Sequence, residues 1–305
     1  MQLRQLEYFV QVVELGSVSK ASSTLSIAQP AISRQIRKLE DELGARLLVR
    51  DGRGVKTTPL GELFVSRARD ILRDLKQMKA EISDSVGEPM DELNIGIPPV
   101  VGSEFIAELV RRFRVNYPLA NLRVIEGFSY QIVDWIQLGR LDLGLIYAPG
   151  YYNKIDVRTI ANQGLHLIGP PDQKDFVEAN HNFEDCVKLP LILPVRPNSF
   201  WEMLQHGAKL KQVEINLLLE VDSIFAIRKL VKQGEGFSVM PYSAVHEDVS
   251  RGELIATRIT NPDLVQPIAI AFPKRGINTL TGNKLVELID EIVREFVEQG
   301  KWSVA

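Results

Sequence analysis

The chain has 305 residues, of which 45% are hydrophobic and 25% charged, with a formal net charge of −3 and one cysteine. The length predicts two or three folding units, and the composition is that of an ordinary water-soluble protein. A single cysteine, Cys186, excludes an intramolecular disulfide and fits a reducing cytosol. No stretch approaches the roughly 18–20 unbroken apolar residues of a membrane span, and the first residues have helical spacing unlike a signal peptide, so we expect a cytoplasmic protein.

Three short helices are predicted at the start of the chain. Apolar residues recur every three or four positions over 3–13, which indicates a first helix ending near Gly16. Ser17 can cap a second helix over 18–25. A third helix is expected over 29–43, with Pro30 in its tolerated first turn and Gly44 as its stop. Its core stripe comprises Ile32, Ile36, Leu39 and Leu43, and its exposed polar stripe comprises Gln29, Ser33 and Arg37, flanked by Arg34 and Lys38.

A hairpin and a long helix are predicted next. β-Prone runs surround Asp51-Gly52, a hairpin signal, and Thr58 then caps a helix that begins at Pro59 and continues to about Ser85. One face of this helix carries Leu60, Leu63, Phe64, Ala68, Ile71, Leu75, Met78 and Ile82. So long an apolar stripe predicts a coiled-coil-like partner helix. "SVGEPMDE" follows as a linker.

The charge of this region differs modestly from that of the rest of the chain, so the overall negative charge argues little against nucleic acid as a partner. Residues 1–58 contain nine Lys/Arg and six Asp/Glu, giving +3, so the rest of the chain carries −6. Local charge governs attraction to phosphate, and the second helix of a helix-turn-helix unit fits the major groove. Any one polar residue of the third helix could simply be a solvated surface residue. The whole polar stripe, taken together with the three helices and the basic hairpin, indicates DNA binding. The expected contacts are Ser17, Gln29, Pro30, Ser33, Arg34, Arg37 and Lys38 in the helices and Arg50, Arg53 and Lys56 in the hairpin.

From Leu93 onward, strand-like runs alternate with amphipathic helices, which predicts a mostly parallel sheet covered by helices. Two groups of such elements, with extended crossings near Ala161 and Pro267, suggest two lobes joined by two strands. A cleft between two α/β lobes is a natural site for a small molecule.

The segment "VSKASSTLSIAQPAISRQIRKLEDELGARLLVRDGRGVKTTPLG" resembles the DNA-binding region of the LysR-type bacterial transcriptional regulators. The resemblance continues through "FRVNYP", "LGRLDLGLIY", "LPLILP" and "GFSVMP" in the second half of the chain. "SIAQPAISRQI", "GRLDLGLIY" and "DSIFAIRKLV" are most similar to the nitrogen-assimilation-control subgroup.

The resemblance implies a multidomain fold. It implies an N-terminal all-α winged helix-turn-helix over 1–58, a dimerisation linker helix over 59–88 and an α/β effector-binding domain over 89–305. That domain would have two lobes, 91–161 with 267–305 and 162–266, like a periplasmic binding protein. The implied partners are promoter DNA, a small-molecule effector and further copies of the chain, as a homodimer through the linker helix and commonly a homotetramer.

Two departures from the family pattern bear on these expectations. Ala28 stands where many members place Ser or Thr, so the third helix has no side-chain cap. The loop after the first sensor strand reads Pro98-Pro99 where many members have hydroxyls for an anionic effector. Two prolines remove two N–H donors, which leaves Ser103 as the nearest hydroxyl, and the neighbouring Glu104 is unfavourable to an anion. We therefore expect a weak anion site, with an effector that is small or largely apolar, or none.

The effector candidates follow strand ends. They are Pro98, Val100, Ser103, Phe128, Ser129, Arg196, Asn198, Phe200, Ile224, Phe225 and Tyr242. Arg196 is the best counter-charge for a carboxylate, although an exposed loop arginine needs no ligand. Phe128 and Phe200 fit a protein core as well as a ligand site.

Three alternatives stay open on sequence alone: an effector-independent regulator, an α/β enzyme with a helical appendage and a plain architectural DNA-binding protein. The enzyme is disfavoured because the four histidines lack metal-ligand spacing and no G-x-S-x-G, G-x-x-x-x-G-K-[ST] or G-x-G-x-x-G motif occurs at a strand end. We expect no catalytic residue, metal or cofactor.

Overall fold

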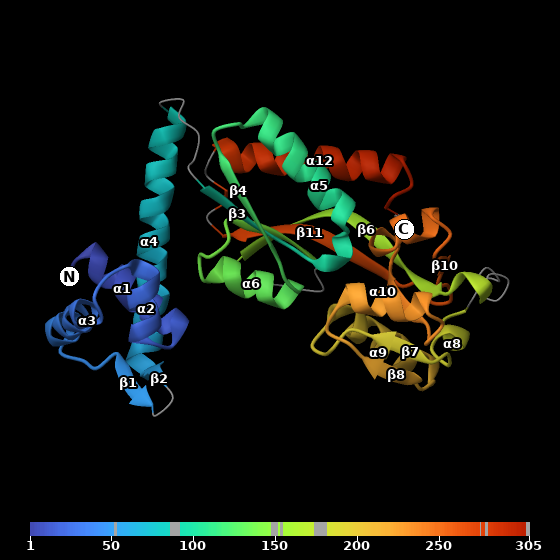
Figure 1. The fold of residues 1–305 in the computed structure, drawn as a ribbon, viewed down its shortest axis with the longest axis horizontal. Helices are drawn as coiled ribbons and strands as arrows, with labels where there is room; N and C mark the ends of the chain where they lie inside the picture. The colour runs from blue at the N-terminus through green and yellow to red at the C-terminus, as the bar shows by residue number, and fades with distance from the viewer. Residues whose placement is uncertain are drawn as a thin grey trace. The chain divides into compact units, whose positions relative to one another are not determined.

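The computed structural model divides the chain into two compact units, Met1–Glu88 and Pro89–Ala305 (Figure 1). The structure describes residues 1–51, 54–85, 92–147, 152, 155–173, 182–274, 276–277 and 280–302. Within these residues, no helix combines the length and the apolar character needed to cross a membrane.

Three helices form the core of the first unit: α1 (Leu3–Leu15), α2 (Val18–Leu25) and α3 (Gln29–Leu43). Their boundaries agree with the sequence prediction because the local signals are strong. Gly16 and Gly44 end α1 and α3 in the left-handed conformation that favours glycine. The shared core contains Leu6, Phe9, Val12, Ala21, Ile32, Ile36 and Leu39.

The predicted hairpin is present as β1 (Leu48–Asp51) and β2 (Gly54–Thr57), paired antiparallel from Leu48↔Thr57 to Asp51↔Gly54. The backbone N–H of Val55 donates to the carbonyl of Gly16 at 2.9 Å, which joins the hairpin to the end of α1. A Cβ atom on Gly54 would lie 2.5 Å from that same carbonyl oxygen, so this contact requires glycine. The predicted turn residue Gly52 lies outside the described residues.

The long helix α4 (Pro59–Ser85) has two apolar faces rather than the single one predicted. Phe64 and Ala68 pack into the helical core, and the ring of Phe64 meets that of Phe9 edge-on at 5.2 Å. Assigning these two residues to the partner-helix stripe was therefore wrong. The remaining exposed stripe comprises Leu60, Leu63, Ile71, Met78 and Ile82, each 42–60% exposed.

The second unit is built on one large sheet with the order β10-β6-β11-β5-β3-β4, and β9 also pairs with β6. The strands are β3 (Glu92–Ile97), β4 (Asn121–Glu126), β5 (Leu143–Tyr147), β6 (Ile155–Gly169), β9 (Ser238–Pro241), β10 (Ile255–Arg258) and β11 (Val265–Pro273). β3 is parallel to β4 and β5, but β11 is antiparallel to both β5 and β6, and β9 and β10 are antiparallel to β6. The prediction of a mostly parallel sheet was wrong, because β11 returns through the sheet against its neighbours.

β6 and β11 are the two long crossing strands that the sequence suggested. They pair from Ile155↔Pro273 to Gly164↔Val265, and Pro267 lies opposite Asn162. One end of this pair joins β3, β4 and β5 in the first lobe. The other end joins β9 and β10 in the second lobe, where a small parallel sheet contains β7 (Leu191–Leu193) and β8 (Leu217–Glu220).

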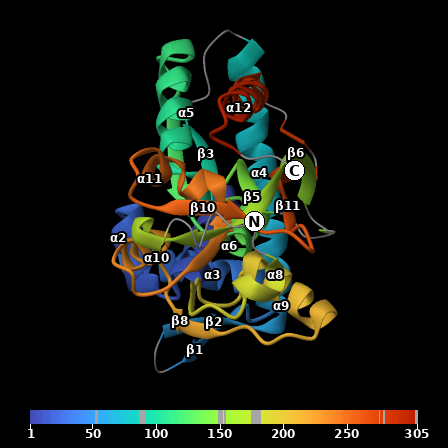
Figure 2. The same cartoon turned by 90° about the vertical axis from the view of Figure 1, so that its right-hand side faces the viewer.

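Helices cover both lobes. In the first lobe, α5 (Ser103–Asn116) and α12 (Leu280–Glu298) pack together on one face of the sheet and α6 (Ser129–Gln137) covers β5 (Figures 1 and 2). The second lobe contains α8 (Phe183–Cys186), α9 (Ser199–Lys211), α10 (Ile224–Lys232) and α11 (His246–Ser250). The chain also forms the short 3-10 turns η1 (Pro99–Val101), η2 (Pro171–Gln173) and η3 (Tyr242–Ala244). Sequence analysis did not find α8, α11 or β10, which are too short to show a clear period.

Candidate functional site

The polar face of α3 points to solvent. Gln29, Pro30, Arg34, Arg37 and Lys38 are exposed and Ser33 is half-buried. On the opposite face of the helix, Ile32, Ile36 and Leu39 are buried. Among the residues that the structure describes, the three basic side chains of this face have no hydrogen-bond or ion-pair partner. This leaves their charged groups available to an external partner.

The start of α3 has the open geometry that Ala28 predicts. Ala28 is the N-cap residue and makes no side-chain capping bond. Ser17 does cap α2, accepting a hydrogen bond from the Lys20 backbone N–H at 3.4 Å. Ser17 therefore has a structural role at the start of that helix.

The hairpin places one predicted contact clearly. Lys56 is exposed on β2, where it lies opposite Val49 of the paired strand β1. Arg50 lies on β1, opposite Val55. Arg53 falls outside the described residues, so its position in the proposed contact surface stays a prediction.

Glu40 is a buried acid that sequence reasoning missed. Only 5% exposed, its carboxylate accepts hydrogen bonds from the backbone N–H groups of Leu47 at 2.8 Å and Leu48 at 3.1 Å, and from the Arg46 guanidinium at 2.8 Å. Burial opposes the charged form, but the two backbone donors and Arg46 outweigh it and hold the pKa of Glu40 below its usual range. The carboxylate thereby fixes the end of α3 to the start of the hairpin.

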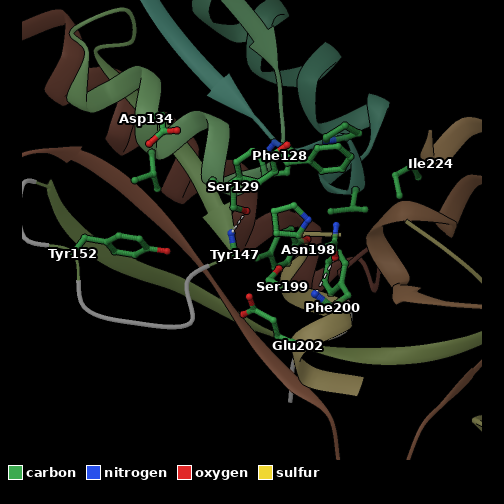
Figure 3. A pocket seen from close by; sticks show the side chains of 16 residues that line it. Phe128, Ser129, Asp134, Tyr147, Tyr152, Asn198, Ser199, Phe200, Glu202 and Ile224 are labelled. Atoms are coloured by element: carbon green, nitrogen blue, oxygen red, sulfur yellow. Dashed lines mark hydrogen bonds between the residues drawn. The ribbon is translucent and has the colours of Figure 1, made fainter. Parts of the chain in front are cut away.

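The second unit contains a cavity of about 250 Å³ between its two lobes (Figure 3). Seven of the predicted effector residues line it: Pro98, Val100, Phe128, Ser129, Asn198, Phe200 and Ile224. Pro99, which the sequence analysis noted for its missing N–H, also lines the cavity. Sequence reasoning missed Tyr130, Val133, Asp134, Tyr147, Tyr152, Pro197, Ser199 and Glu202. Most of these lie within or just beyond a helix or strand end, one turn from a residue that was predicted.

Three predicted effector residues do not line the cavity because each has another partner. Arg196 forms a double hydrogen bond with the Glu220 carboxylate at 2.9 and 3.1 Å, and its guanidinium lies 4.9 Å from the centre of the Trp201 ring. The hydroxyl of Ser103 donates to Glu247 at 3.0 Å.

Tyr242 is the third predicted effector residue that does not line the cavity. The centre of its ring lies 5.5 Å from that of His166 and 5.8 Å from that of His246. Phe225, which also came from a strand-end argument, is 74% exposed and does not line the cavity either.

The helix starts at the cavity are capped from within the protein. The backbone N–H of Phe128, before α6, donates to the Gln131 side-chain carbonyl at 2.8 Å. The Asn198 side chain accepts from the backbone N–H of Phe200, at the start of α9, at 2.9 Å. Ser129 accepts from the Tyr147 backbone N–H at 3.0 Å. One backbone N–H group at the start of each of these two helices is thus bonded within the protein.

Hydrogen-bonded polar side chains are buried beside the cavity. The hydroxyl of Tyr147 donates to the side-chain carbonyl of Gln163 at 2.8 Å, and Ser243 donates to the Val100 carbonyl at 3.0 Å. Burial raises the pKa of Tyr147, so this hydroxyl stays protonated. Gln163 lies opposite Gln266 in the β6–β11 pair, and both are 1% exposed. Through its bond to Tyr147, Gln163 links the cavity to the crossing strands.

No candidate metal site emerges from the described part of the chain. Its His, Cys, Asp and Glu side chains form no group of three that could hold a metal ion. Burial lowers the pKa of His166 to about 4, despite its contact with the Gly164 carbonyl, so the ring is neutral at pH 7. Burial likewise raises the pKa of Cys186 to about 12, so this thiol is not a reactive thiolate.

Comparison with known proteins agrees with both halves of this description. Residues 3–62 match the family model of the bacterial regulatory helix-turn-helix protein, lysR family, and residues 87–294 match that of the LysR substrate binding domain. The regulator BbuR of Bordetella bronchiseptica is 26% identical over 297 residues, which cover 97% of this chain and 91% of BbuR. The nitrogen assimilation regulatory protein nac of Escherichia coli is 26% identical over 308 residues, which cover 100% of this chain and 99% of that protein.

Solved structures show the same architecture. A full-length OxyR variant from Pseudomonas aeruginosa superimposes with a TM-score of 0.75 at 23% identity, covering 96% of this chain and 95% of that chain. The multidomain fold predicted from the sequence is thereby confirmed. Because the two family models together cover most of its length, the chain belongs to the LysR family of bacterial helix-turn-helix transcriptional regulators.

Proposed function

We propose that α3 reads promoter DNA and that the cavity between the lobes binds the small molecule that modulates this binding. The observation that carries the DNA half is the division of α3 into a buried apolar face and an exposed face with three basic side chains. An α-helix of this kind fits the major groove, where Arg reads guanine and Gln reads adenine. Gln29, Ser33 and Arg34 set the sequence preference, and Lys56 of the hairpin contacts phosphate.

The exposed apolar stripe on α4 supports the proposal that the chain forms a dimer through this helix. Five large apolar side chains stand on this helix at 42–60% exposure, from Leu60 to Ile82. A second copy of α4 would cover them in a coiled-coil-like dimer. Such a dimer presents two α3 helices to half-sites about one helical turn apart, or a multiple of it, and two dimers make the tetramer.

The cavity supports an effector role because both lobes contribute to it. Pro98 and Phe128 come from the first lobe and Asn198 and Phe200 from the second, so a bound molecule touches both. A ligand that contacts two lobes favours one lobe arrangement over another, and this shifts the population of assemblies on DNA. The genes so regulated would be metabolic ones, and the protein would act in the cytoplasm, where bacterial DNA lies.

Catalysis is not part of the proposal. The curated relatives named above are regulators, and the described residues of the cavity include no nucleophile paired with a base. The protein would work through binding alone.

The test is a DNA-binding measurement on the region upstream of the chain's own gene, by fluorescence anisotropy, against a scrambled duplex of equal length. We expect specific binding by the wild type and its loss in Gln29→Ala/Arg34→Ala. Equal affinity for both duplexes would contradict the proposed readout by α3. A metabolite thermal-shift screen on the same protein tests the effector half, and turnover of a metabolite without DNA affinity would favour an enzyme.

A further inference from the structure

The walls of the inter-lobe cavity are aromatic and apolar. Five rings line it: Phe128, Tyr130, Tyr147, Tyr152 and Phe200. Tyr147 and Phe200 meet edge-on with ring centres 5.1 Å apart, and the rings of Phe128 and Tyr130 stack at 6.2 Å. At about 250 Å³, the cavity is below the roughly 300–1,000 Å³ of sites for drug-sized ligands, so its ligand is small.

The charge of the cavity is negative. Among the described residues that line it, Asp134 and Glu202 are the charged ones, and no Lys, Arg or His is present. Asp134 comes from α6 in the first lobe and Glu202 from α9 in the second (Figure 3). Neither carboxylate has a cationic partner in the part of the chain that the structure describes. Both are exposed at the cavity, where a cation can approach them.

The two groups expected from the sequence to balance a ligand's negative charge are already engaged. Arg196, the nearest predicted counter-charge, is paired with Glu220, and the Ser103 hydroxyl at the start of α5 donates to Glu247. Gln131 and Asn198 cap the helix starts of α6 and α9. Pro98 and Pro99 have no N–H to donate. A carboxylate in this cavity would face two like charges, and no basic side chain stands among the described lining residues to compensate.

We infer that this cavity takes a small protonated amine with an apolar aromatic body and no carboxylate. The inference rests on the proposed role of the cavity as the effector site. The negative charges of Asp134 and Glu202 attract the ammonium group, and the faces of the neighbouring rings add a cation–π attraction. The aromatic body fills the space between Val100, Phe128 and Ile224.

The experiment is calorimetric titration of the full chain with three single-ring probes that differ in charge: 2-phenylethylamine, 2-phenylethanol and 3-phenylpropionate. We expect the amine to bind at least about fivefold more tightly than the alcohol, and the acid to bind most weakly. Asp134→Asn and Glu202→Gln should each weaken amine binding about threefold or more. Alcohol binding should change less than about twofold, because the alcohol carries no charge.

Matched controls separate local from general charge effects. Asp222→Asn and Glu214→Gln remove exposed acids of the second lobe that do not line the cavity, and should leave the preference for the amine unchanged. The inference is overturned if the acid binds as tightly as the amine. It is also overturned if Asp134→Asn/Glu202→Gln keeps the full amine preference, or if none of the three probes binds.

The same samples test the proposed function separately. Anisotropy with upstream DNA and no ligand measures DNA binding alone, and loss of specific binding there overturns the proposed DNA readout without touching the ligand class. Specific DNA binding without an amine preference overturns only the ligand class. Amine binding that leaves DNA affinity unchanged supports the ligand class and overturns the effector role of the cavity.

Discussion

A Cβ atom on Gly61 would lie 2.0 Å from the carbonyl oxygen of Leu47, far inside van der Waals contact. The first turn of α4 therefore lies directly against the start of the hairpin. Thr58 ties the two together: its backbone N–H donates to the Leu47 carbonyl at 2.9 Å, and its hydroxyl donates to the Arg46 carbonyl at 2.8 Å. The "TPLG" sequence thus starts the helix and also provides the residues that pack α4 against the start of the hairpin.

Gly61→Ala should destabilise the first unit. In an unconstrained helix this change stabilises by about 1 kcal/mol, but here the methyl group collides with backbone and should cost about 1–3 kcal/mol. Urea unfolding monitored by circular dichroism measures the difference. Glu7→Ala, an exposed change on α1, should stay within about 0.5 kcal/mol. A more stable Gly61→Ala protein would contradict the close approach to Leu47.

The pKa of Glu40 predicts acid sensitivity of the same unit. Because the folded state lowers this pKa below 4.5, the stabilising contribution is complete above about pH 4.5 and is lost as the pH falls through the lower folded value. Glu40→Gln should cost about 1–3 kcal/mol at pH 7 and should flatten the fall in the free energy of unfolding between about pH 5 and 3. Asp41→Asn, its exposed neighbour, should do neither. Parallel pH profiles of wild type and Glu40→Gln would count against the assignment.

DNA contacts should divide into two kinds. Arg34→Ala should cost about 1–3 kcal/mol at the matched site and relax specificity, because a base contact is lost. Lys56→Ala should weaken all DNA similarly and lower the salt slope by about one, because a phosphate contact is lost. Anisotropy titrations over a salt series distinguish the two, with Lys229→Ala on the surface of α10 as the control. An unchanged salt slope for Lys56→Ala would remove it from the contact surface.

The exposed stripe of α4 predicts the strength of the dimer. Leu63 is 60% exposed, and Leu63→Asp places a charge where a second α4 should pack. We expect at least about a tenfold rise in the dimer dissociation constant, since burial of a leucine is worth about 1.5–3 kcal/mol. Sedimentation velocity over a concentration series measures it. Leu210→Asp, at a similarly exposed site on α9, should leave the dimer intact. A dimer indifferent to Leu63→Asp would assign dimerisation to another surface.

Local signals made the helices of the first unit predictable. The caps at Gly16, Ser17 and Gly44 and the alternation of buried and exposed positions along α3 depend on neighbours in the sequence, so they could be recognised directly. The pairing of Arg196 with Glu220 depends instead on a strand that follows 24 residues later. The periodicity of a sequence does not predict which acidic side chain will pair with a given arginine.

The same limit applies to the sheet and the cavity. The direction of β11 is set by how the chain returns from the second lobe, which local patterns do not contain. Asp134 and Glu202 lie on separate helices of separate lobes, and only the fold brings them to one cavity. Strand ends located seven of the lining residues, because the ends of strands in such lobes converge on one side.

The internal capping of α6 and α9 has a thermodynamic consequence for whatever enters the cavity. Gln131 and Asn198 each bond one helix-start N–H group, and most of the lining is aromatic, aliphatic or proline, so an incoming molecule removes much apolar surface from water. Association of this kind has a negative heat-capacity change. Its enthalpy becomes steadily more favourable on warming, so a van't Hoff plot for this protein's ligand is curved.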